Sequence, residues 1–163
     1  MSIIAAVDGE QIPDRAVEVG ADLATQYDEE FVVVHVMSQD AYEKRSDSDT
    51  TANFGFPTAA DANYGSTSGD AYTVNQANRD AAGVAEDITK QTLDALPADA
   101  SYVGRVGETV REVLGVVESL DNATYLVVGG RRRTPVGKAV FGSATQSFLL
   151  NADLPVVTVM TEE

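Results

Sequence analysis

The sequence contains no cysteine and only one histidine, His35, in 163 residues. Without cysteine, neither a disulfide framework nor a thiolate metal site can form. A single histidine also excludes metal sites built from several imidazoles. A Ser-His-Asp triad would have to include His35, and we identify no nucleophile paired with it. Because His35 lies in an apolar run, we interpret it as a buried, hydrogen-bonded side chain.

Long hydrophobic runs are also missing. The apolar run near the N-terminus, Ile3–Val7, is too short for the core of a signal peptide, and no basic segment precedes it. No window approaches the roughly 18 apolar residues of a transmembrane helix. We therefore expect a soluble, cytoplasmic protein that does not insert into membranes.

Basic residues are scarce, with 11 against 26 acidic residues and a net charge of -15. Such a chain repels nucleic acid, so we expect no nucleic-acid partner. The acidic residues are spread along the whole sequence, which is typical of surfaces adapted to high salt, where the screening length falls to roughly 3 Å. We expect a protein from a halophilic archaeon. The alternative is an acidic mesophilic domain.

Strand-like and helix-like segments alternate along the chain. β-Branched apolar runs predict strands at Ile3–Val7, Phe31–Val36, Ser101–Val106, Tyr125–Val128 and Pro155–Met160. Helical periodicity follows each of the first four runs: from Pro13 to Tyr27, over Val74–Leu96, after Gly107 and over Ser143–Asn151. This order predicts an α/β domain with an open, five-stranded parallel sheet and helices on both faces. Ligands of such sheets bind at the carboxyl ends of the strands.

Residues 39–73 break this alternation. They are rich in Ser, Asp, Thr, Asn, Ala and Gly and contain few aliphatic side chains. We interpret them as a long surface loop, partly disordered, inserted after the second strand.

The stretch VVGGRRRTPVGKAVFGSATQ, residues 127–146, holds four of the 11 basic residues in eight consecutive positions: Arg131, Arg132, Arg133 and Lys138. It is not a Walker A loop, because Arg132 and Ala139 stand where that motif needs Gly and Ser or Thr. A Rossmann glycine fingerprint would follow the first strand, and none is present there.

Glycines at a strand end and at a helix start remain as the candidate anion site. Gly129 and Gly130 end a predicted strand, and Gly142 and Ser143 begin a predicted helix. Glycines let backbone amides approach an anion, and a helix N-terminus offers unpaired N–H groups. Ser143 could cap that helix or donate to a phosphate oxygen. The alternative to a phosphate site is an ordinary turn capped by Ser143 beside a solvated basic patch.

These segments, taken in order, resemble the universal stress proteins of the UspA type. The resemblance covers most of the chain and rests on IIAAVDG, VVVHVMS, VGRVGETVREVL, VVGGRRRTPVGKAVFGSATQSFLL and ADLPVVTV. It implies a single UspA-like domain over residues 1–163, with residues 39–73 as an addition. It also implies a Rossmann-like fold similar to the adenine nucleotide alpha hydrolases, with strand order 3-2-1-4-5.

Nucleotide-binding members of this family carry the pattern G-x2-G-x9-G-[ST]. Gly129 matches its first position, and Gly142 and Ser143 match its last two. Arg132 replaces the second glycine. Its side chain could clamp a phosphate, or it could occupy the space that a phosphate needs.

The resemblance implies an ATP-binding regulatory or stress-response module, with or without Mg²⁺ and without strong catalysis. The residues implied to contact the nucleotide are Asp8, Val36, Val128, Gly129, Arg132, Gly142, Ser143, Ala144 and Thr145. The family also implies a homodimer through the last strand, Pro155–Met160, where an edge is available for pairing. Two alternatives stay open: a dimer that binds no nucleotide and acts through protein contacts, and a slow ATPase with Asp8 as its base.

Overall fold

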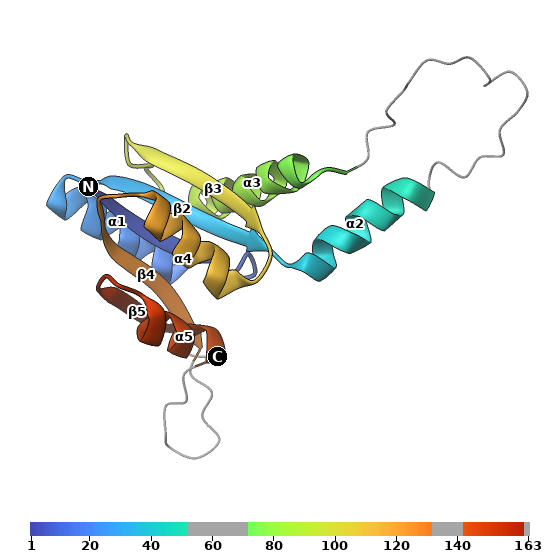
Figure 1. Cartoon of the computed structure of the whole chain (residues 1–163). Coiled ribbons are helices and arrows are strands. Elements are labelled where there is room, and N and C mark those ends of the chain that lie inside the picture. Colours follow the sequence, from blue (N-terminus) through green and yellow to red (C-terminus); the bar gives the residue numbers. More distant parts are fainter. Residues whose placement is uncertain (52–71, 132–141, 162–163) are drawn as a thin grey trace, which may run out of the picture.

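The structure is a computed structural model that describes residues 1–51, 72–131 and 142–161. Five parallel strands form one sheet in the order β3-β2-β1-β4-β5 (Figure 1). The strands are β1 (Ser2–Val7), β2 (Glu30–Met37), β3 (Ala100–Val106), β4 (Ala123–Arg131) and β5 (Val156–Thr161). The predicted α/β fold and its strand order are confirmed.

Helices cover both faces of the sheet. Helices α1 (Arg15–Tyr27) and α3 (Val74–Thr92) pack on one face, and α4 (Thr109–Ser119) and α5 (Ser143–Asn151) pack on the other. The central strands β1 and β2 therefore lie between two apolar layers, which explains why most of their residues are apolar. Within the described parts of the chain, no helix combines the length and the apolar content needed to cross a membrane.

Side-chain caps set where three of these helices begin. Asp14 caps α1, Thr73 caps α3 in a capping box with Gln76, and Glu108 caps α4. Pro13 was predicted in the first turn of a helix, but it precedes the N-cap Asp14 and lies outside α1. The carboxylate of Asp14 satisfies a first-turn N–H group, so the helix begins after it.

Helix α3 lies against β3 at Gly104, where the backbones approach closely. A Cβ at Gly104 would meet the backbone oxygen of Asn78 and the backbone nitrogen of Ala82. Glycine is therefore required here for packing. This contact fixes the distance between α3 and the sheet.

The predicted loop over residues 39–73 is wrong for its first part, because Gln39–Thr51 form helix α2. Its sequence has no apolar stripe, since most of this helix projects away from the body of the molecule (Figure 1). Local bonds support its start: the hydroxyl of Ser38 accepts from the N–H of Ala41 at 3.2 Å. Residues 52–71 of the predicted loop lie outside the described residues.

The base of α2 and the start of α3 form a small separate apolar cluster. Met37, Ala77 and Ala81 are buried in it, and Tyr42 and Tyr72 pack against it with ring centroids 5.7 Å apart. Arg45 of α2 and Asp80 of α3 form an exposed ion pair at 3.2 Å above this cluster. These contacts hold the two ends of the insertion together at the carboxyl end of β2.

Candidate functional site

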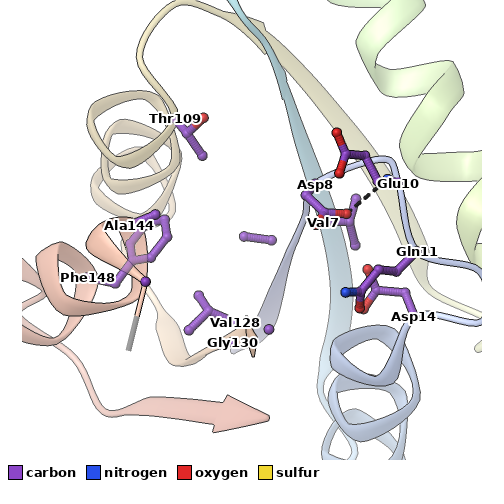
Figure 2. A pocket seen from close by; sticks show the side chains of 13 residues that line it. Val7, Asp8, Glu10, Gln11, Asp14, Thr109, Val128, Gly130, Ala144 and Phe148 are labelled. Atoms are coloured by element: carbon purple, nitrogen blue, oxygen red, sulfur yellow. Dashed lines mark hydrogen bonds between the residues drawn. The ribbon is translucent and has the colours of Figure 1, made fainter. Parts of the chain in front are cut away.

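A cavity of about 350 Å³ lies at the carboxyl ends of β1 and β4 (Figure 2). The chain leaves β1 toward β2 on one side, while β4 lies on the other side, so this is the switch point of the sheet. Open parallel sheets bind their ligands at this position. The residues lining the cavity are Ala6, Val7, Asp8, Glu10, Gln11, Asp14, Thr109, Val128, Gly129, Gly130, Gly142, Ala144 and Phe148.

The turn after β1 presents Asp8 at the cavity. The carboxylate of Asp8 accepts a hydrogen bond from the backbone N–H of Glu10 at 2.9 Å. Between them, Gly9 has a φ of 88°, a conformation that favours glycine. The side-chain bond and the glycine together fix this tight turn.

Asp14 forms the buried side of the same wall, with only 5% of its surface exposed. Its carboxylate accepts from the N–H of Ala16 at 2.9 Å, and its own N–H donates to the hydroxyl of Thr92 at 3.0 Å. Burial raises the pKa of Asp14, an effect opposed by the bond from Ala16 and reinforced by the charge of Asp8. The folded protein therefore binds a proton at Asp14 more tightly than the unfolded chain does.

Asp14→Asn is expected to leave the free energy of unfolding at neutral pH equal or slightly higher, because asparagine caps helices nearly as well and carries no charge to bury. The raised pKa means that wild-type stability is lowest when Asp14 is ionised. It should recover as the pH falls through the folded pKa toward the ordinary value of 3.8.

Urea unfolding of wild type and Asp14→Asn at matched pH values measures this effect. The stability difference between them should shrink on acidification. A variant that is less stable than wild type at neutral pH would mean that the charge of Asp14 stabilises the start of α1 more than its burial costs.

The opposite wall is the N-terminus of α5. Helix α5 begins at Ser143, as predicted, and its N-cap residue is Gly142. Capping by Ser143, one of the two roles that the sequence left open for this residue, is therefore not observed. Within residues 1–51, 72–131 and 142–161, no side chain caps this helix. Among the described residues, no side chain therefore competes for the first-turn N–H groups, which carry partial positive charge near the cavity.

The two glycines at this wall are not explained by packing. A Cβ added at Gly129 or Gly142 would meet nothing within 4 Å among the described atoms. The neighbouring Gly130 differs, because a Cβ there would lie 2.7 Å from the sulfur of Met160. Gly129 and Gly142 therefore leave open space beside the cavity, whereas Gly130 is needed for contact with β5.

Five of the nine predicted contact residues line the cavity: Asp8, Val128, Gly129, Gly142 and Ala144. Val36 is buried at the end of β2 and does not line it, nor does Ser143. Thr145 is buried, and its hydroxyl donates to the carbonyl oxygen of Gly129 at 3.5 Å. Arg132 lies outside the described residues.

Sequence reasoning missed Glu10, Gln11, Asp14 and Thr109 as lining residues. Glu10 and Gln11 closely follow Asp8, so the turn after the first strand could have pointed to these two. Thr109 is the first residue of α4 and lies across the cavity from Asp8 (Figure 2). It follows the third strand, whose loop gave no sequence signal because it contains no cluster of charged residues or of glycines.

In the described part of the chain, no group of three or more His, Asp or Glu residues is placed to hold a metal ion.

An open parallel sheet with a cavity at its switch point defines a Rossmann-like α/β protein. Within this class, the chain belongs to the universal stress protein family, whose family model matches residues 1–160. No curated protein matches the sequence.

Solved structures agree with this fold. A universal stress protein from Archaeoglobus fulgidus is 21% identical, with 97% of each chain covered and a TM-score of 0.59. The same organism's protein in complex with dAMP is 18% identical, with a TM-score of 0.53 over 97% of this chain and 96% of that one. A universal stress protein in complex with cAMP is 15% identical, with a TM-score of 0.55 over 99% and 97% of the two chains.

Proposed function

We propose that this protein binds an adenine nucleotide at the switch-point cavity and acts as a regulatory module of the stress response without strong catalysis. The observation that carries the proposal is the open space beside Gly129 and Gly142, next to the N-terminus of α5. Among the described residues, no side chain caps these backbone N–H groups, and N–H groups at a helix N-terminus form a seat for phosphate. The complexes of structural neighbours with cAMP and dAMP support an adenine nucleotide.

The charges around the cavity favour one orientation of the bound nucleotide. Asp8, Glu10 and Asp14 place carboxylates on the wall after β1, and none of the described lining residues is Lys or Arg. A phosphate is repelled from that wall and attracted to α5, which follows the segment holding Arg131, Arg132, Arg133 and Lys138 in the sequence. Carboxylates suit the hydroxyl groups of a ribose, so the nucleoside belongs on the wall after β1.

The number of phosphates is part of the same proposal. A cavity of about 350 Å³ is at the small end of ligand sites, and a chain of phosphates would extend from it along the N-terminus of α5. We propose ATP as the ligand. Mg²⁺ would arrive bound to its phosphates, because protein Mg²⁺ sites commonly combine one or two carboxylates with substrate phosphates. Slow hydrolysis would depend on Asp8 as base, and residual turnover in Asp8→Asn would exclude that role.

Nucleotide content and affinity, measured on one preparation, test the proposal. Because the net charge of -15 suggests a protein that works in high salt, purification and titration belong in molar KCl. Denaturing the purified protein and chromatographing the supernatant should release an adenine nucleotide. Titration of ATP, AMP and cAMP into the stripped protein should give at least one micromolar dissociation constant. A clean supernatant and no titratable binding to folded protein would overturn the proposal and favour a family member that acts through protein contacts.

We also propose a homodimer through the last strand. β5 lies at the end of the sheet, and the neighbouring helix α5 exposes Leu149 and Leu150 to 46% and 83%. An edge strand beside exposed leucines can pair with a second copy.

Leu150→Asp is expected to shift the protein from dimer to monomer at micromolar concentration, since it puts a charge on that surface. Light scattering after size exclusion measures the mass. Leu96→Asp is the matched control, because Leu96 is also exposed, at 43%, and lies far along the chain from β5. A monomeric wild type, or a dimer unaffected by Leu150→Asp, would contradict an interface at this edge.

A further inference from the structure

His35 lies outside the cavity but touches the turn that builds its wall. It is a register partner of Val7 in the β1–β2 pairing and is half-buried on the α1 and α3 side of the sheet, as the alternation with Val33 requires. The Nδ1 atom of His35 is 3.1 Å from the carbonyl oxygen of Val7. A carbonyl only accepts hydrogen bonds, so Nδ1 carries the proton and donates.

The imidazole of His35 also lies against Gly9. A Cβ at Gly9 would stand 2.9 Å from Cε1 of His35 and 3.4 Å from Cγ1 of Val84 on α3. The histidine ring therefore lies directly beside the left-handed residue of the turn. His35 therefore contacts both neighbours of Asp8: it is hydrogen-bonded to Val7, and its ring lies against Gly9.

Both neighbours of Asp8 are thus held by a side chain on the face of the sheet that α1 and α3 cover. Val7 and Asp8 line the cavity, while His35 does not. Beyond Val7 the strand ends, and no further residue of β1 pairs with β2. The bond from His35 extends the attachment of β1 to β2 up to the point where the turn begins.

We propose that His35 is a positioning residue that fixes the Asp8–Gly9–Glu10 turn and thereby sets the direction of the Asp8 carboxylate at the cavity. This inference rests on the proposed nucleotide site only for its affinity readout, because the order of the turn can be measured without ligand. The probe of order is the N–H of Glu10, whose bond to Asp8 exists only when the turn is closed.

Two substitutions separate the bond from the packing. His35→Phe keeps an aromatic ring beside Gly9 but removes the donor, and His35→Asn removes the ring but can place an amide donor near the position of Nδ1. One lost hydrogen bond corresponds to about a three- to tenfold change in an equilibrium. We expect His35→Phe to speed hydrogen exchange at the N–H of Glu10 by about that factor and to weaken AMP binding to the same extent. We expect His35→Asn to restore part of both.

Ile88→Val is the control, because Ile88 is buried in the same layer and does not line the cavity. It should lower stability slightly and leave exchange at Glu10 and AMP affinity unchanged. If exchange at Glu10 is the same in wild type and His35→Phe, the positioning role is overturned, whatever the affinity does. If His35→Phe fails to fold, His35→Asn decides: turn exchange and affinity close to those of wild type support the role of the donor, and loss of both argues against it. If wild type binds no nucleotide but exchange at Glu10 still accelerates, the nucleotide proposal fails and the positioning role stands.

Discussion

Gly142→Val is expected to weaken adenine-nucleotide binding by about 100-fold while leaving the fold intact. The side chain would enter the open space beside the cavity and cover the N–H groups at the start of α5. Hydrogen bonds to a charged phosphate contribute about 1.5–3 kcal/mol each, so the loss of one or two gives a factor of this size. Titration of AMP and ATP into both proteins measures it.

Stability should change far less than affinity. Gly142 has φ −60° and ψ 155°, an extended conformation that any residue adopts. Valine is a poorer N-cap than glycine, so the expected loss is about 1 kcal/mol of unfolding free energy. Gly115→Val is the matched control: Gly115 is exposed on α4, a Cβ there also meets nothing within 4 Å among the described atoms, and it does not line the cavity. Equal affinities in the two variants would mean that phosphate does not bind at α5.

The strands and four of the helices could be predicted from the sequence because each has a strong periodic signal. Phe31–Val36 is apolar at nearly every position, as a strand covered on both faces must be, and β2 extends it by one residue at each end. Helix α2 could not be found in this way. It projects from the body, so nothing selects apolar residues along it, and its start depends on the local bond of Ser38.

The candidate site was predicted in part for a similar reason. The spacing of Gly129 and Gly142 and the position of Asp8 at a strand end are properties of sequence and topology, and all three residues line the cavity. Thr109 and Asp14 carry no such signal, because they reach the cavity only through the packing of α4 and α1 on the sheet. Burial of Asp14, which raises its pKa, is likewise a property of the assembled fold.

The second large effect concerns the fold itself: Gly104→Ala is expected to destabilise the protein by about 3 kcal/mol. The methyl group would meet the backbone of Asn78 and Ala82 on α3, and backbone atoms cannot turn aside as a flexible side chain can. Either α3 moves away from β3 or the strand bends, and both changes loosen the packing of Ala81 and Ala85. Urea unfolding in molar KCl should show a lower midpoint with an unchanged slope.

Gly83→Ala is the matched control on the same helix. Gly83 is half-buried and lies two residues after the tightly packed Ala81, and a Cβ there meets nothing within 4 Å among the described atoms. Because alanine favours helices over glycine, this variant should be more stable by about 0.5–1 kcal/mol. If Gly104→Ala lowers the free energy of unfolding and Gly83→Ala raises it, the close approach of α3 to β3 at Gly104 accounts for the loss. Equal midpoints in Gly104→Ala and wild type would mean that α3 can shift outward freely. Val84 of α3, which lies beside Gly9, would then not restrain the turn that carries Asp8.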